Sequence, residues 1–568
     1  MNKRLRERRF AGGLSAALVV IAVVFCGWSA PGGAAESTSA IASAHPLATA
    51  AGRAILERGG NAFDAAVAVA AALGVVEPYS SGLGGGGFFL LHRNADGRQV
   101  TVDARETAPA GVTEAHYFDS EGRPIAGATT RGGTAAAIPG MAAGLVHVAQ
   151  RYGKLPLSVT LDPAIRLARD GFPVDARFAR IAGLREAFLQ SGVNTAVLLA
   201  RGKAPEIGFL LKQAALATTL ERIARFGAAG FYEGPVAQAM VDTVNKAGGV
   251  WSAADLRGYR VVEREPVRFS YRGAVITAAT LPSAGGIALA QTLGMLERFP
   301  LERVGVPETD HLVVETLRRA FHDRARYLAD PDFVQVPVAR LVSRDYVQKR
   351  AAGIDSAHAT RSDTLGAIET ARLESHHTTH LSVVDAQGNR VAATLTINLL
   401  FGAGIVPTGT GVLLNNEMDD FSLRPDVPNA FQLRGGIANR IEPGKRPLSS
   451  MTPAFVEDDK GVLILGTPGG SRIVSQVLLA IVEYVRSPEV DLQRLVGMPR
   501  YHHQYWPDVI EIEPEGFSPE WRSAMAAKGH TIRPVNRAWG NMQAVFKAKR
   551  GGAARAASDP RGDGLACY

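Results

Sequence analysis

The pattern of hydrophobic and polar positions predicts helices and strands in both halves of the chain. Residues 45–58 indicate a helix that Gly59-Gly60 closes, because glycine readily takes the left-handed conformation of a helix cap. Residues 62–73 are apolar on nearly every side, which predicts a second helix that is buried all round. Residues 88–93 and 98–105 are expected to form two strands joined by a turn.

The remaining pattern changes along the chain. From about Leu145 to Leu328 it is mainly helical, with loops rich in glycine and proline. Residues 351–377 have no sustained period, which predicts a mobile connector. Beyond Thr378 strand patterns dominate, apart from one apolar helix at about 473–485. Helices and strands are therefore mixed in both halves, as in an α+β or layered α/β protein.

The first 35 residues are predicted to be a secretory signal peptide. A basic head precedes an apolar run from about Leu14 to Phe25 and an alanine-rich exit near Ala35. This segment contains five basic residues and one acid, so its removal lowers the formal net charge from +8 to +4. We expect a periplasmic or secreted protein. Removal of Cys26 with the signal leaves Cys567, which alone cannot form an intrachain disulfide.

Thr378 begins a predicted hairpin and carries the most specific candidate chemistry. If residues 386–388 form the turn, Thr378 lies opposite Thr396, and Thr396 shares a face with Asn398. Cleavage of the connector at His377–Thr378 would free an α-amino group, whose reference pKa is about 7.7–8.0. This amine could accept the threonine hydroxyl proton near neutral pH. From the hairpin alone, a simple cross-strand pair of threonines is the favoured interpretation.

Several long motifs resemble those of the γ-glutamyltransferases, from about residue 38 to Tyr568 and in the family's order. They include TTHLSVVD at 378–385, LNNEMDDF at 414–421, KRPLSSM at 445–451, GTPGGSR at 466–472, GGNAFDA at 59–65 and RETAP at 105–109. The resemblance implies an N-terminal-nucleophile hydrolase fold, an αββα sandwich. It also implies self-cleavage into a large subunit, residues 36–377, and a small catalytic subunit, residues 378–568, which stay associated.

The same resemblance implies a role for each matching residue. Thr378 would attack the γ-glutamyl amide of a glutathione-like donor, and water or an amino-acid or peptide amine would resolve the resulting ester. Thr396 would contact the nucleophile, and the backbone N–H groups of Gly469 and Gly470 would stabilise the oxyanion. The substrate carboxylate would bind Arg105, Ser449 and Ser450, and its ammonium group would bind Asn398, Glu417 and Asp420. Residues 425–436 resemble the loop that covers the pocket in many bacterial members of the family. Phe431, where an aromatic residue often gates the pocket, could cover the site without a hydroxyl to latch it.

Other classes of function fit the sequence less well. Residues 82–87 match G-x-G-x-x-G, but a helix precedes them and a strand follows, the reverse of a dinucleotide loop, so we expect a turn that backs the pocket. The histidines lack the spacing of a zinc site, no cofactor is required, and no basic stripe indicates nucleic-acid binding. The alternatives are an N-terminal-nucleophile acylase acting on another acyl group, such as a β-lactam side chain or poly-γ-glutamate, and a binding homologue without turnover.

Overall fold

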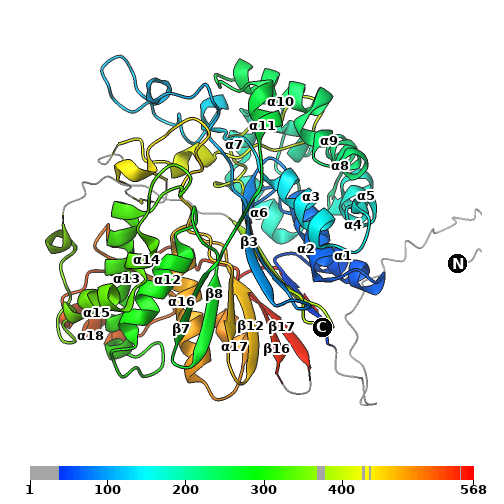
Figure 1. The fold of residues 1–568 in the computed structure, drawn as a ribbon. Helices are drawn as coiled ribbons and strands as arrows, with labels where there is room; N and C mark the ends of the chain where they lie inside the picture. Colours follow the sequence, from blue (N-terminus) through cyan, green and yellow to red (C-terminus); the bar gives the residue numbers. More distant parts are fainter. Residues whose placement is uncertain are drawn as a thin grey trace, which may run out of the picture. The chain divides into compact units, whose positions relative to one another are not determined.

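The computed structural model describes residues 38–366, 378–424, 429–430, 432–433, 436–549 and 552–567. Its largest sheet has seven strands and contains the predicted hairpin (Figure 1). In spatial order the strands are β18 (Leu565–Cys567), β1 (Ala40–Ser43), β9 (Thr379–Val384), β10 (Arg390–Thr396), β2 (Gly86–Arg93), β3 (Arg98–Ala104) and β6 (Val262–Arg264).

A six-stranded sheet packs face to face against the first. Leu90 and Ala392 of the first sheet share one apolar cluster with Phe455, Ile464 and Val545 of the second. In spatial order the second sheet contains β17 (Ala554–Ser558), β16 (Gln543–Ala548), β12 (Gly461–Gly466), β11 (Ala454–Glu457), β8 (Ala274–Ala278) and β7 (Val267–Tyr271).

One layer of helices covers the outer face of the seven-stranded sheet. Helix α2 begins with a capping box between Asn61 and Asp64 and is buried along nearly its whole length, as its sequence predicts. This layer contains α1 (Pro46–Glu57), α2 (Ala62–Val76), α3 (Met141–Tyr152), α4 (Leu157–Thr160), α5 (Asp162–Asp170), α6 (Ala176–Leu184), α7 (Glu186–Gln190), α8 (Ala214–Phe226), α9 (Ala229–Tyr232), α10 (Gly234–Lys246) and α11 (Ala253–Gly258).

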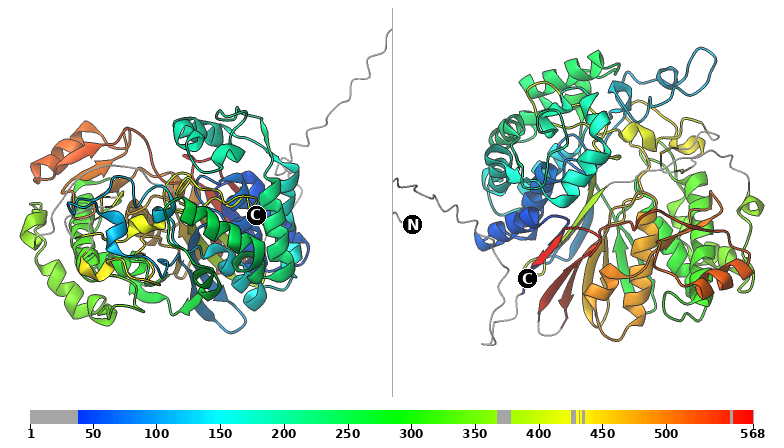
Figure 2. Two further views of the ribbon diagram at one scale, coloured as in Figure 1. Left: turned by 90° about the horizontal axis from the view of Figure 1, so that it is seen from above. Right: turned by 180° about the vertical axis from the view of Figure 1, so that it is seen from behind.

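A second layer covers the outer face of the six-stranded sheet, so the described structure has the predicted order of helix, sheet, sheet and helix (Figure 2). The long helices of this layer, which share one core with this sheet, are α12 (Gly285–Leu296), α13 (Pro307–Tyr327) and α16 (Arg472–Arg486), and the shorter helices α17 (Leu492–Gly497) and α18 (Pro519–Ala527) add residues to the same core. The other helices of this half are α14 (Val338–Leu341) and α15 (Arg344–Ala352). No helix in the described ranges is long and apolar enough to span a bilayer.

Short strands complete the architecture. The small sheets pair β4 (Phe172–Pro173) with β5 (Leu210–Leu211), and β14 (Ile510–Ile512) with β13 (Tyr501–His502) and β15 (Ile532–Pro534). The region predicted as mainly helical also contains β6, β7 and β8, which the sequence pattern did not reveal. Strands from before and after Thr378 alternate in the seven-stranded sheet, since β9 and β10 lie between β1 and β2. Hydrogen-bonded ladders therefore hold the two predicted subunits together.

The predicted connector is ordered in its first part. Helix α15 extends into it as far as Ala352, and a 3₁₀ turn spans Ser362–Leu365. Residues 367–377, which include His377 of the predicted cleavage site, lie outside the described residues.

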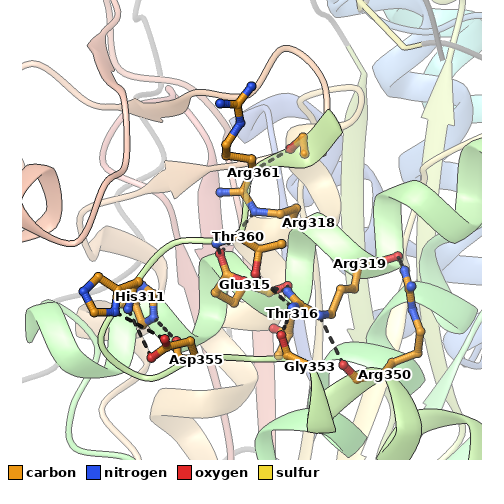
Figure 3. A network of polar contacts seen from close by, with 12 residues as sticks. His311, Glu315, Thr316, Arg318, Arg319, Arg350, Gly353, Asp355, Thr360 and Arg361 are labelled. Atoms are coloured by element: carbon orange, nitrogen blue, oxygen red, sulfur yellow. Dashed lines mark hydrogen bonds and ion pairs between the residues drawn. The ribbon is translucent and has the colours of Figure 1, made fainter. Parts of the chain in front are cut away.

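A polar network binds this ordered part to α13 (Figure 3), and Asp508 of the predicted small subunit also contacts it. Glu315 accepts a hydrogen bond of 3.0 Å from the backbone N–H of Thr360. Arg318 donates to the Ser362 hydroxyl at 2.6 Å, and Asp508 accepts from the Ser362 backbone N–H at 2.8 Å. Residues 360–362 of the predicted large subunit are therefore hydrogen-bonded both to α13 and to the predicted small subunit.

Candidate active site

The predicted hairpin positions Thr378. Strands β9 and β10 pair with Thr379 opposite Leu395, which is the predicted register. A backbone hydrogen bond of 3.1 Å closes the three-residue turn at 386–388. Continued by one residue, this register places Thr378 opposite Thr396, and both side chains are buried.

The glycine-rich segment before β2 supports the end of β10. A Cβ atom on Gly85 would lie 2.0 Å from the carbonyl oxygen of Thr396, and one on Gly87 would lie 2.5 Å from that of Thr394. Only glycine permits this close approach of two backbones. The segment therefore backs the strand that carries Thr396.

Gly469 and Gly470 form a tight turn at the N-terminus of α16. Their φ angles are +140° and +57°, in the region that side chains disfavour. Their carbonyl oxygens accept hydrogen bonds of 3.1 Å from the backbone N–H groups of Arg472 and Ile473 in the first helical turn. The N-terminus of α16 adds positive potential to this turn, which suits an oxyanion.

A small cavity on one side of Thr378 contains equal numbers of basic and acidic side chains, and we call it the charge-balanced cavity. It brings together all the predicted catalytic and substrate-binding residues except Gly469. It is lined by Arg105, Arg324, Thr378, Thr396, Asn398, Glu417, Asp420, Leu433, Ser449, Ser450, Met451, Gly470, Ser471 and Ile473.

Arg105 is the centre of the polar contacts in this cavity. Its guanidinium donates to Glu417, to Asp420 at 2.5 Å and to the carbonyl oxygen of Pro447 at 3.1 Å. Glu417 and Asp420 lie at the two ends of one 3₁₀ turn, Glu417–Asp420. Both acids can therefore contact the same guanidinium.

Burial and mutual attraction shift the pKa values of this group. Burial disfavours the charged guanidinium, but Glu417 and Asp420 reverse that effect and raise the pKa of Arg105. Burial also raises the pKa of Glu417 and of Asp420, and the attraction of Arg105 offsets only part of the effect. Glu106, 3.6 Å from Arg105, has a pKa raised by burial to about 8.

Four buried polar atoms of the cavity have no hydrogen-bond partner among the described residues. They are Asn398 Oδ1, Glu417 Oε2, Ser450 Oγ and Arg324 Nε. Buried polar atoms are nearly always paired in folded proteins, so a group of unpaired ones around a cavity indicates a polar ligand. Two acceptors, a hydroxyl and a cation match a ligand that carries both an ammonium and a carboxylate group.

Arg324 of α13 is the charged lining residue that the sequence analysis missed. Only 4% of its surface is exposed, and it forms no ion pair within the described ranges. Burial lowers its pKa to about 10, while Asp420 opposes this shift. Other arginines precede it in the same helix, and no local motif distinguishes Arg324 from Arg318 or Arg319.

Thr378 also lines a second cavity of about 440 Å³, which we call the arginine-lined cavity. It contains five arginines and no acidic residue, and the sequence analysis assigned a role to none of these arginines, although Arg472 ends the GTPGGSR motif. Its lining comes from α6, the residue before β9, the start of α16 with the turn before it, and the C-terminal region: Arg177, Arg180, Ile181, Thr378, Pro468, Gly469, Arg472, Val535, Asn536, Arg537, Ala538, Trp539, Gly540 and Arg561.

The loop predicted to cover the pocket lies partly outside the described residues. Phe431 is among those left out, so its predicted gating role stays a prediction. The described part lies against the site: Asn429 donates to Asp420 at 3.2 Å, and Leu433 lines the charge-balanced cavity.

The sandwich, with a threonine at the start of a central strand, defines the class of N-terminal-nucleophile hydrolases. A cephalosporin acylase from Bacillus halodurans has the same fold, with a TM-score of 0.80, 26% sequence identity and alignment over 96% of this chain and 99% of the acylase. The family model of gamma-glutamyltranspeptidase matches residues 48–568. The chain therefore belongs to the gamma-glutamyltranspeptidase family.

Two curated relatives carry different names within this similarity. The glutathione hydrolase proenzyme of Escherichia coli (strain K12) is 40% identical over 526 residues, which are 92% of this chain and 90% of the relative. The acylase ACY 1 proenzyme of Pseudomonas sp. (strain V22) is 39% identical over 527 residues, which are 90% of each chain. Overall similarity therefore does not separate a glutathione hydrolase from an acylase, and the residues that line the cavity are needed to choose between them.

Proposed function

We propose that the protein is a self-processing γ-glutamyltransferase and glutathione hydrolase. The chain is cut between His377 and Thr378, which frees the α-amino group of Thr378. This amine accepts the proton of the threonine hydroxyl as the oxygen attacks the γ-glutamyl amide. The proton passes to the departing amine, and a γ-glutamyl ester of Thr378 remains. Water or the amine of an amino acid or peptide then releases the glutamyl group.

The observation that best supports this proposal is the match between a zwitterionic acyl group and the unpaired atoms of the charge-balanced cavity. Arg105, Arg324 and Ser450 supply donors for the substrate α-carboxylate. The two unpaired acceptors, Asn398 Oδ1 and Glu417 Oε2, together with Asp420, suit the α-ammonium group.

The carbonyl carbon that Thr378 attacks would lie at the turn before α16. Gly469 and Gly470 offer backbone N–H groups there without side chains in the way. A developing negative charge at this point would gain from both donors and from the helix N-terminus.

An acylase for another acyl group is the second candidate, because the ACY 1 relative is nearly as similar as the E. coli one. A glutaryl group carries the carboxylate of a glutamyl group but lacks its ammonium. Such a group would leave the two unpaired buried acceptors, Asn398 Oδ1 and Glu417 Oε2, without a donor, although Arg105 would still pair with Glu417 and Asp420. The γ-glutamyl assignment is therefore favoured.

We also propose that the protein is exported and that its two subunits stay associated after cleavage. The predicted signal peptide supports export. The alternation of large- and small-subunit strands in the seven-stranded sheet supports association, because separation would break several hydrogen-bonded ladders.

The test is the intact mass of the purified protein beside its Thr378→Ala variant, together with hydrolysis of glutathione by each. We expect two co-purifying fragments that divide between His377 and Thr378, and one uncut, inactive chain in the variant. An uncut wild-type protein that hydrolyses glutathione would contradict the mechanism. Cut protein that releases a glutaryl group faster than a γ-glutamyl group would favour the acylase instead.

A further inference from the structure

We propose that the arginine-lined cavity binds the part of the substrate beyond the scissile amide and selects leaving groups and acceptors that carry a carboxylate. This inference rests on the proposed function and adds the chemical class of the second substrate. That part of the reaction had no recognisable motif in the sequence.

The positions of the catalytic residues indicate which cavity holds the acyl group of the substrate and which holds its amine. Thr378 lines both cavities, whereas Gly470 lines the charge-balanced cavity and Gly469 lines the arginine-lined cavity. A carbonyl carbon attacked by Thr378 and held by this turn therefore lies at the junction. If the glutamyl end occupies the charge-balanced cavity, the amine that leaves or enters must occupy the other.

The charges around the arginine-lined cavity indicate which chemical group the leaving or entering amine carries. Arg472 and Arg561 are held at 2.6 Å by Glu511 and Glu513, which do not line the cavity. Arg177 lies 4.0 Å from Glu77, and its Nε has no hydrogen-bond partner among the described residues.

Arg180 extends the positive charge to the rim. It is exposed and forms neither an ion pair nor a hydrogen bond within the part of the chain that the structure describes. A cavity with surplus positive charge and no lining acid attracts anions and repels cations. The forked donors of arginine also match the geometry of a carboxylate.

The remaining lining suits the body of a small peptide. Ile181, Val535 and Trp539 supply apolar surface beside the arginines, and the Arg472 guanidinium lies 5.1 Å from the centre of the Trp539 ring. A volume of about 440 Å³ is in the range of small-molecule sites. A dipeptide with a free carboxyl end fits this chemistry, and glutathione releases such a dipeptide when its γ-glutamyl bond is cut.

The experiment compares two substrates with the same acyl group, γ-glutamyl para-nitroanilide and its analogue with a carboxylate on the anilide ring. The measured quantity is the ratio of kcat/KM for the carboxylated substrate to kcat/KM for the plain one. We expect Arg180→Gln to lower this ratio about threefold and Arg180→Glu to lower it about tenfold, as expected for a partly solvated charge pair. Arg257→Gln, an exposed arginine outside both cavities, should leave the ratio at its wild-type value.

The outcomes separate this inference from the proposed function. A ratio that falls in the order wild type, Arg180→Gln, Arg180→Glu supports the inference. A wild-type protein that cleaves both anilides with a ratio that neither variant changes overturns this inference alone. A processed wild-type protein that cleaves neither anilide overturns the proposed function and this inference with it.

Discussion

The two cavities beside Thr378 differ in charge and in exposure. The charge-balanced cavity sets Arg105 and Arg324 against Glu417 and Asp420, and its two arginines are 0% and 4% exposed. The arginine-lined cavity has five arginines and no acid, and its Arg180 is exposed. Buried charges must be compensated by opposite charges, whereas charges at a rim remain solvated and need no partner.

This difference matches the demands of acyl transfer. The γ-glutamyl group is the constant part of every donor, so a buried and compensated site can hold it in one orientation. The leaving group and the acceptor vary, and water must also reach the ester. A more open site that selects only by charge permits this variation. The charge-balanced cavity thus recognises its ligand through paired contacts, and the arginine-lined cavity recognises its ligand through surplus positive charge.

The largest expected effect comes from removing an acid of the charge-balanced cavity. Asp420→Asn takes away the charged partner of the substrate ammonium and of Arg105. Loss of one partner from a buried pair costs about 3 kcal/mol or more, roughly a hundredfold in kcat/KM. Steady-state rates with γ-glutamyl and glutaryl anilides check this. The loss should be large for the γ-glutamyl substrate and much smaller for the glutaryl one, and an equal loss for both would contradict the assigned ammonium site.

The pKa of Asp420 adds a pH dependence to the same contact. Burial raises this pKa above its ordinary value of 3.8, and Arg105 offsets the effect only in part. The carboxylate must be charged to bind the ammonium. As the pH falls through the raised pKa, Asp420 takes up a proton and KM for the γ-glutamyl substrate should increase. This acid limb should lie above pH 3.8 and be absent in Asp420→Asn.

Replacement of Arg324 should have the next largest effect. It should weaken binding of the substrate carboxylate rather than of the substrate ammonium group. Arg324→Gln removes a charged donor, which is worth about 1.5–3 kcal/mol, or roughly tenfold to a hundredfold in KM. A γ-aminobutyryl anilide, which lacks the α-carboxylate, should lose much less. Arg326→Gln is the matched control, because Arg326 lies on the same helix but is exposed and lines neither cavity. Equal losses with both substrates would indicate that Arg324 only supports the fold.

The sequence predicted the charge-balanced side of this comparison far better than the other. Alternating side chains and a polar turn were enough to set the register that places Thr378 opposite Thr396, and the family motifs contain Arg105 and Asp420. These features are local in the sequence, so they can be recognised without knowledge of the tertiary structure. Arg324 was missed because α13 carries several buried charges, and helical spacing alone does not say which of them faces a cavity.

The arginine-lined cavity was not predictable in the same way. Arg180 lies in α6, Arg472 in α16, and Arg561 near the C-terminus, so only the packing of three distant segments brings them together. Strands β6 to β8 were missed for a related reason, because they are short segments between long helical stretches and are completed by pairing with β3 and β11. Long-range pairing decides such elements more than local propensity does.

A change in salt concentration should have the smallest effect on kcat/KM. It should distinguish the two cavities, because their arginines differ in exposure to solvent. Raising the ionic strength from about 0.1 M to about 1 M shortens the Debye length from about 10 Å to about 3 Å. Attraction between a solvated arginine rim and a carboxylate is screened over that range, whereas buried pairs are screened much less. We expect kcat/KM for the carboxylated anilide to fall about twofold to threefold, as for other exposed charge pairs, while the plain anilide responds little. Stopped-flow or steady-state rates at matched pH measure both. A similar response of the two substrates would mean that the arginine-lined cavity does not act through surplus charge.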